Sequence, residues 1–87
     1  MPKSGMSGYG DIKTKKFLNV ITWLKNHKPV TVGKGGRHNL KIVCIHNEQS
    51  FSLPTSHPEI NKHIVKAFAD WLVKNEICTK EEFDEKI

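Results

Sequence analysis

Two β-rich runs separated by a glycine pair constrain the fold of this chain more than any other feature. The stretch from Val30 to Ile45 holds both runs, and Gly35 and Gly36 lie between them. Glycine reaches positive φ angles without a steric cost, so the pair suits the tight turn of a β-hairpin. The pattern predicts two antiparallel strands, Val30 to Lys34 and Arg37 to His46. The second strand carries apolar residues on both alternating faces, which predicts a central, buried position.

A further strand follows the hairpin, and a helix precedes it. The run from Ser50 to Leu53 comes after a short polar turn, and short connections favour an antiparallel meander. Between Asp11 and His27, apolar residues recur at helical spacing on one face: Phe17, Val20, Ile21 and Leu24. Three lysines lie near the start of this predicted helix: Lys13, Lys15 and Lys16. A solvent-exposed helix face is favoured for them over an auxiliary contact with phosphate.

A capping pattern predicts a second helix after the third strand. Ser56 precedes Glu59 by three residues, as in a capping box, and Pro58 suits the first helical turn. The predicted helix runs to about Asn75. Its core face is expected to hold six residues at helical spacing: Ile60, Ile64, Ala67, Phe68, Trp71 and Leu72.

The capping pattern recurs near the end of the chain. Thr79 and Glu82 predict a short final helix from Lys80 to about Lys86, which Phe83 docks against the core. The predicted elements together give an α+β fold. This fold is a two-layer sandwich of α-β-β-β-α order, with helices on one face of a three-stranded antiparallel sheet, plus the short C-terminal helix.

The chain has 87 residues, which predicts a single domain over residues 12–87. Residues 1–11 are rich in glycine and serine and are expected to form a flexible tail. For Tyr9, within this tail, a disordered aromatic is favoured over packing on the domain or stacking on a base.

The formal net charge of +5, with a sequence pI near 9.4, favours an anionic partner. Nucleic acid, an acidic protein and a membrane surface all meet this description. A chain this short buries one core and leaves little room for a deep cavity. Any active site is therefore expected to be shallow and suited to an extended or polymeric substrate.

The residue types at hand predict neither a metal site nor a cofactor. Cys44 and Cys78 are too few for a disulfide scaffold, and Cys44 lies in an apolar run. The sequence contains no Cys-x-x-Cys or His-x-x-x-His pair of the kind that zinc sites use. It also lacks an apolar secretion signal and a transmembrane stretch, so a cytoplasmic protein with no membrane partner is expected.

The strongest candidate for chemistry is His38, which directly follows the predicted turn among the cations Lys34, Arg37 and Lys41. Histidine titrates near neutral pH and serves as a general base or acid. RNA cleavage without a metal needs such a group to move protons, and cations to stabilise the charge that develops on the phosphate. The residues alone leave open that His38 only ends a strand.

Several other residues are candidates for phosphate contact. Gly35 and Gly36 let a phosphate backbone approach closely. His57 precedes the predicted second helix, whose N-terminus favours anions, and Lys62 belongs to a basic stretch of that helix. The alternative for His57 is a polar loop residue with no ligand, and the alternative for Lys62 is a position on a solvent-exposed helix face.

The order of elements, with Gly35-Gly36-Arg37-His38 opening the second strand, resembles the HicA (YcfA-like) toxins of bacterial toxin–antitoxin modules. That family places one histidine after a small glycine-containing turn, commonly Gly-Ser-His, and His38 matches it. Pro54 to His57 resembles the family's Pro-x-His element with one extra residue. The resemblance covers about Phe17 to Ile77, and Arg37 stands where the family commonly has serine.

The resemblance implies an mRNA interferase with a double-stranded-RNA-binding-domain-like fold and a HicB-like antitoxin as its protein partner. Only His38 is carried over as catalytic. A non-catalytic RNA-binding module and a basic protein-interaction domain are the alternative functions that the same residues allow.

Overall fold

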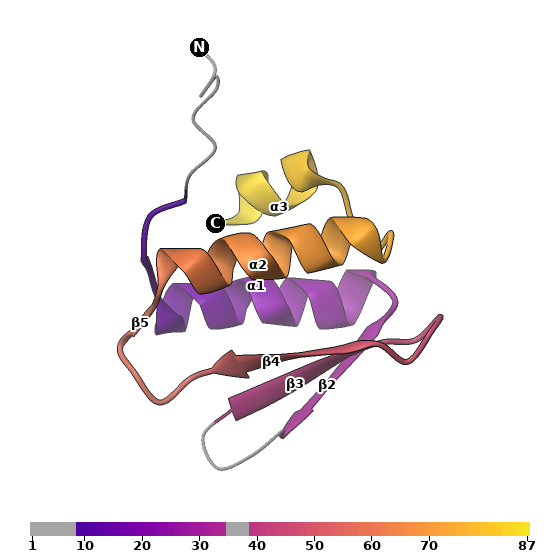
Figure 1. Ribbon diagram of the computed structural model, residues 1–87, viewed down its shortest axis with the longest axis horizontal. Coiled ribbons are helices and arrows are strands. Elements are labelled where there is room, and N and C mark those ends of the chain that lie inside the picture. The colour runs from indigo at the N-terminus through magenta and orange to yellow at the C-terminus, as the bar shows by residue number, and fades with distance from the viewer. Residues whose placement is uncertain (1–8, 35–38) are drawn as a thin grey trace.

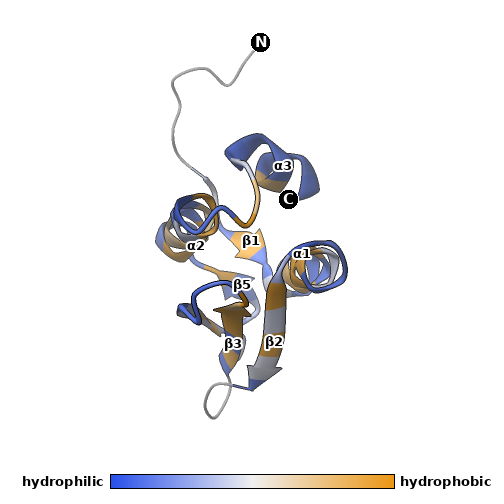
Figure 2. Ribbon diagram, turned by 90° about the vertical axis from the view of Figure 1, so that its right-hand side faces the viewer, coloured by the Kyte–Doolittle hydropathy of each residue, from blue (hydrophilic) through white to orange (hydrophobic). Residues whose placement is uncertain are grey.

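The computed structural model describes residues 9–34 and 39–87 (Figure 1). Along the chain the elements are β1 (Ile12–Lys13), α1 (Thr14–His27), β2 (Val30–Lys34), β3 (Asn39–Cys44), β4 (Ser50–Pro54), β5 (Glu59–Ile60), α2 (Lys62–Lys74) and α3 (Lys80–Lys86). The long helices α1 and α2 lie side by side over one face of the β2-β3-β4 sheet, and α3 lies on their outer side (Figures 1 and 2). The predicted α+β fold with a C-terminal helix is confirmed.

The sheet is an antiparallel meander with β3 in the centre, as predicted. Alternation along the strands turns apolar side chains toward the helices, and Ile42, Cys44 and Leu53 are fully buried there. The predicted bounds of β3 were too wide, because Ile45 and His46 belong to the turn that leads to β4. Arg37, the predicted first residue of this strand, lies outside the described residues.

The apolar stripe of α1 is confirmed, since Phe17, Val20, Ile21 and Leu24 are all buried. The helix begins at Thr14, three residues later than expected. Long-range pairing explains the difference, because Ile12 and Lys13 form β1 and pair antiparallel with β5. Asp11 also lies outside the helix, and its carboxylate accepts a hydrogen bond from the backbone N–H of Lys62 at 2.8 Å.

The predicted start of α2 was wrong. Glu59 and Ile60, expected in the first turn, form β5, and no capping box forms at Ser56. The N-cap of α2 is Asn61, whose side chain accepts a hydrogen bond from the backbone N–H of His63 at 2.7 Å. Ser56 and Glu59 satisfied the pattern by residue type, but pairing with β1 holds this segment in an extended conformation.

The predicted core face of α2 was only partly right. Phe68 and Leu72 are buried, but Ala67 is exposed and Val65 and Ala69 are buried in its place. The prediction counted helical spacing from Ile60, which precedes the helix. Ile60 itself is buried, and Ile64 and Trp71 are partly buried against the core, so Ala67 is the one residue of the predicted face that is exposed.

The final helix matches its prediction from Lys80 to Lys86, with the capping box between Thr79 and Glu82 present in full. Phe83 is fully buried, and its ring makes edge contacts with Phe17, Phe68 and Tyr9 at centroid distances of 6.3, 6.1 and 5.9 Å. The favoured interpretation of Tyr9 as a disordered aromatic was wrong. Tyr9 packs on α3, and its hydroxyl donates a hydrogen bond to the carboxylate of Asp84 at 2.6 Å.

Candidate functional site

Two predicted phosphate-binding lysines lie at the same end of the sheet. Lys34 is the last residue of β2 and pairs with Leu40. Lys41 lies on β3 and pairs with Gly33. Both lysines are exposed, and strand alternation directs their side chains to opposite faces of the sheet. The two cations therefore bracket the point where β2 ends and β3 begins.

Four predicted site residues lie outside the described residues. These are Gly35, Gly36, Arg37 and His38, which connect Lys34 to Asn39 along the chain. The catalytic role of His38 accordingly stays a prediction. Its described neighbours along the chain, Lys34 and Asn39, are exposed strand ends.

His57 is exposed but does not adjoin the N-terminus of α2, so that expectation was wrong. The side-chain hydroxyl of Thr14 donates a hydrogen bond to the His57 carbonyl at 2.6 Å, and the Thr14 N–H donates to the Pro58 carbonyl at 2.9 Å. These bonds hold His57 beside the first turn of α1 instead. The difference follows from β5, which moves the start of α2 beyond this loop.

Lys62 is the exposed first residue of α2. Side chains already occupy the backbone donors at this end of the helix, since Asp11 accepts from the N–H of Lys62 and Asn61 accepts from that of His63. An anion here would meet the ammonium group of Lys62 and not a free helix N-terminus. One turn further, Lys66 pairs with Asp70 at 2.9 Å, so its charge is partly compensated.

The outer face of α1 is a broader basic surface than the sequence patterns indicated. The helix contains neither aspartate nor glutamate, and its exposed residues include Lys15, Lys16, Asn19, Thr22, Lys25 and Asn26. Lysine and asparagine side chains donate hydrogen bonds to phosphate oxygens, whereas the hydroxyl of Thr22 already donates to the Leu18 carbonyl at 3.1 Å. The absence of acidic residues from an entire amphipathic helix is the signal by which the sequence reveals this face.

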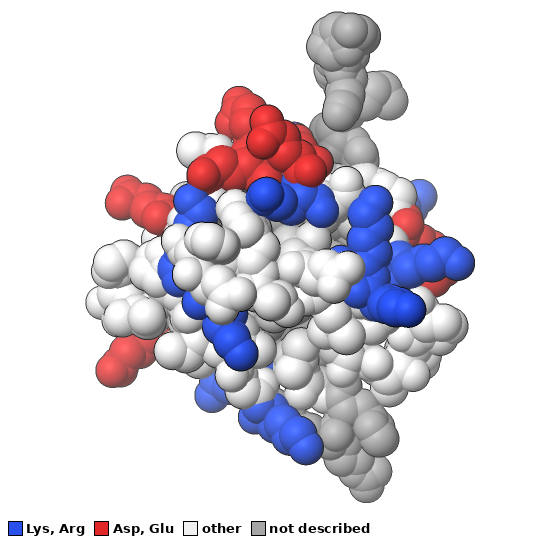
Figure 3. All heavy atoms as spheres, turned by 180° about the vertical axis from the view of Figure 1, so that it is seen from behind, with Lys and Arg blue, Asp and Glu red and all other residues white. Residues whose placement is uncertain are grey.

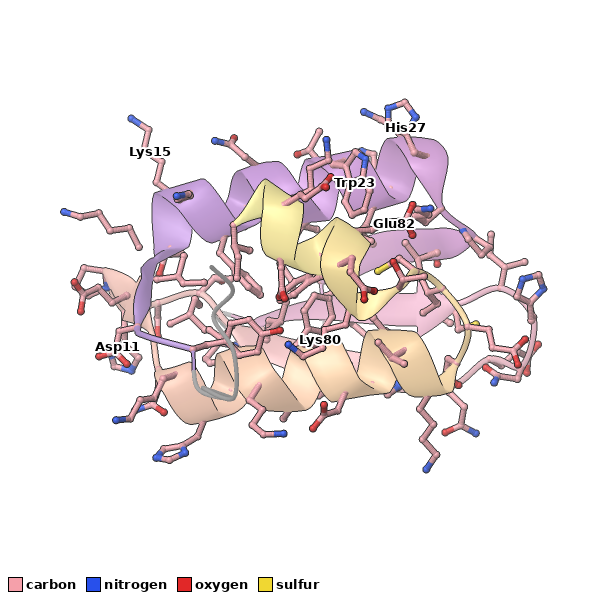
Figure 4. All side chains as sticks on the ribbon, turned by 90° about the horizontal axis from the view of Figure 1, so that it is seen from above. Asp11, Lys15, Trp23, His27, Lys80 and Glu82 are labelled. Carbon is pink, nitrogen blue, oxygen red and sulfur yellow. The ribbon has the colours of Figure 1, made fainter. Side chains whose placement is uncertain are left out.

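Charge is segregated on the molecule. Four of the nine acidic residues belong to the seven-residue helix α3, where red gathers at the top of Figure 3. Figure 3 views the molecule from the side on which α1 lies, and below the acidic region lysines predominate there. Figure 4 shows α3 lying across the two long helices, with Lys15 and His27 at opposite ends of α1. A polyanion therefore meets favourable charge on the α1 side and repulsion at α3.

Among the described residues, no cluster of histidine, cysteine, aspartate and glutamate is able to hold a metal ion. Cys44 and Cys78 are buried free thiols. Burial, together with the nearby carboxylate of Glu82, raises the pKa of the Cys78 thiol to about 11. No helix in the described part of the chain is long and apolar enough to cross a membrane.

Searches of protein-family models, of curated proteins and of solved structures found no match to this chain.

Proposed function

We propose that this chain is an RNA-cleaving toxin, an mRNA interferase of a toxin–antitoxin module, that acts from the cytoplasm. The observation that supports this proposal best is the pair Lys34 and Lys41, exposed on adjacent strands where β2 ends and β3 begins. His38 is the residue directly before β3. In the sequence, His38 follows Lys34 by four positions and precedes Lys41 by three, so the segment supplies a group that moves protons and cations that stabilise charge on a phosphate.

The proposed reaction is transesterification by the substrate's own 2′-hydroxyl. His38, as general base, accepts the proton from that hydroxyl while the 2′-oxygen bonds to phosphorus. The phosphorus–5′-oxygen bond then breaks, and a general acid protonates the leaving 5′-oxygen. Lys34 or Lys41, which project from opposite faces of the sheet, stabilises the negative charge that builds up on the phosphate oxygens. The products are a 2′,3′-cyclic phosphate and a free 5′-hydroxyl.

A second candidate is an RNA-binding module that does not cleave its ligand. The acid-free outer face of α1 supports it, because a basic helix face binds phosphates without any catalytic group. Both candidates bind RNA, and they differ in whether His38 performs chemistry.

The test compares the wild-type protein with His38→Ala on RNA in the presence of a chelator, with the product ends mapped. His27→Ala is the matched control, because His27 is exposed at the far end of α1. We expect cyclic phosphate ends from the wild type and from His27→Ala, and a loss of about 10² to 10⁴-fold in rate for His38→Ala. Salt-sensitive binding without cleavage by any variant would support the second candidate instead.

The proposed protein partner is a HicB-like antitoxin that neutralises the activity. Co-expression with the product of an adjacent small reading frame tests this part separately. Growth arrest that the wild type causes alone, and that co-expression relieves, is the expected result. Arrest that persists in the presence of the adjacent product would contradict it.

A further inference from the structure

A hollow of about 520 Å³ lies where the chain passes from α2 to α3. The helix α2 ends at Lys74, and the chain turns through Glu76 before Thr79 caps α3. The residues that line it belong to the end of α2, the α2–α3 connection and the start of α3. That connection lies at the opposite end of the ribbon from the end of β2 and the start of β3 (Figure 1). The hollow is therefore separate from the proposed RNA site.

The floor of this hollow is apolar. Ile77 and Cys78 are buried at its base, and Val73 remains 42% exposed in the last turn of α2. Val73 is one of only three large hydrophobic residues that are exposed in the described part of the chain. An aliphatic side chain placed here would remove apolar surface of both partners from water.

The rim of the hollow is acidic. Glu76 and Glu81 are exposed, and neither takes part in an ion pair among the described residues. The cation at the rim, Lys80, is already paired with Asp84 at 3.3 Å and lies over the ring of Tyr9. The local field therefore favours a cation, although the chain as a whole carries a formal charge of +5.

Glu76 is also an unfavourable residue at its position. Its φ angle is +57°, in the left-handed region that favours glycine, and it follows the C-terminus of a helix, where a carboxylate opposes the helix dipole. Glycine would suit the backbone better and lysine would suit the dipole better. A glutamate here adds a negative charge to the rim and lowers stability.

From the apolar floor and the acidic rim, we propose that this hollow docks a segment of a partner protein that presents an aliphatic side chain flanked by lysine or arginine. The aliphatic side chain contacts Val73, and the flanking cations pair with Glu76 and Glu81. Nucleic acid does not fit the site, because its phosphates would be repelled by the rim. Occupation of the hollow by the lysine-rich side of a second copy of the chain is a different outcome, which the titration below distinguishes.

The test is a titration of the full ¹⁵N-labelled chain with an acetylated and amidated Lys-Arg-Leu-Arg-Lys peptide, followed by amide chemical shifts. We expect saturable shifts confined to Val73 through Glu82. Lys-Arg-Ser-Arg-Lys, which lacks the aliphatic side chain, is expected to bind about tenfold more weakly. Glu-Asp-Leu-Asp-Glu is expected not to bind.

Matched variants separate docking at the hollow from general attraction. Val73→Ser and the double variant Glu76→Gln/Glu81→Gln are each expected to weaken binding of the leucine peptide, the double variant by about twofold to tenfold. Glu48→Gln/Glu59→Gln removes the same charge from exposed sites elsewhere and is expected to leave binding unchanged.

Three results would overturn the proposal. These are equal affinity for the serine peptide, shifts outside the hollow, and no saturable binding. Concentration-dependent shifts at Val73 through Glu82 without peptide would assign the surface to a second copy and overturn it as well. None of these outcomes depends on RNA cleavage, so failure here and failure of the proposed ribonuclease remain distinguishable.

Discussion

The ammonium group of Lys28 donates a hydrogen bond to the carboxylate of Glu82, with 2.9 Å between Nζ and Oε2. This ion pair joins the residue that follows α1 to the first turn of α3, and the Lys28 nitrogen lies 5.6 Å from the centre of the Trp23 ring. Figure 4 shows Trp23 on α1 and Glu82 on α3. The bond from Lys28, followed by the backbone N–H of Thr79, lowers the pKa of Glu82. We therefore expect the attachment of α3 to depend on pH.

The first prediction concerns this dependence. Because folding lowers the pKa of Glu82, the stabilisation is fully present above the unfolded value, about 4.3, and is lost as the pH falls through the folded value. Glu82→Gln keeps a side chain able to complete the capping box but removes the charge. Urea unfolding should therefore show that the variant is less stable at pH 7 and that the difference narrows toward pH 3.

Glu81→Gln is the control for this experiment, because Glu81 is exposed and has no ion pair among the described residues. Its stability relative to the wild type should change little over the same pH range. A gap between wild type and Glu82→Gln that stays constant from pH 7 to pH 3 would contradict the role assigned to Lys28.

A second prediction concerns the docking of α3. Phe83 is fully buried against Phe17 and Phe68. Phe83→Ala should lower the free energy of unfolding by about 3–5 kcal/mol, because it removes buried apolar surface and leaves a cavity. Phe83→Leu fills more of the space and should cost less. Chemical denaturation followed by circular dichroism measures both, and equal costs for the two variants would argue against a tightly packed ring.

Tyr9 gives the third prediction, at alkaline pH. Burial, followed by the hydrogen bond to Asp84, raises the pKa of Tyr9 above its ordinary value of 10.0. A raised pKa means that the stabilisation is present below pH 10 and is lost as the pH rises above it. Tyr9→Phe should cost about 1 kcal/mol at pH 7, the typical net contribution of one hydrogen bond, and this cost should shrink above pH 10. A pH-independent difference in unfolding free energy would refute the coupling.

Glu76 provides the fourth prediction, which is a gain of stability. Replacing a non-glycine residue in the left-handed region by glycine relieves backbone strain, so Glu76→Gly should stabilise the fold by about 0.5–1 kcal/mol. The same replacement at Glu85, which is exposed within α3, should destabilise by a similar amount. Thermal unfolding of the two variants should therefore shift in opposite directions.

The contrast between α3 and α2 shows which parts of this fold the sequence predicts. The Thr79–Glu82 pattern gave the correct helix because every interaction it needs lies within one turn. The Ser56–Glu59 pattern failed because Ile60 pairs with Ile12, far away in the chain, and that pairing selects an extended conformation. Tyr9 was misjudged for the same reason, since its partners Phe83 and Asp84 are 74 and 75 positions away.

In the candidate site too, the positions that depend on local interactions were predicted and the position that depends on long-range contacts was not. Hairpin periodicity was enough to predict that Lys34 and Lys41 lie at one end of the sheet, because adjacent strands fix their register locally. The position of His57 beside α1 required the hydrogen bonds from Thr14, which join segments 43 residues apart. Local patterns contain no information about such long-range interactions.

The last prediction tests whether the two lysines bind phosphate. Lys34→Gln/Lys41→Gln should weaken binding of single-stranded RNA and lower the slope of log affinity against log salt by roughly 0.7 for each lysine–phosphate interaction that the substitutions remove. Lys74→Gln/Lys86→Gln is the control, because it removes the same charge from exposed positions on α2 and α3. Equal slopes for the two double variants would mean that RNA responds to net charge alone, and the end of the β2–β3 pair would then have no special part in binding.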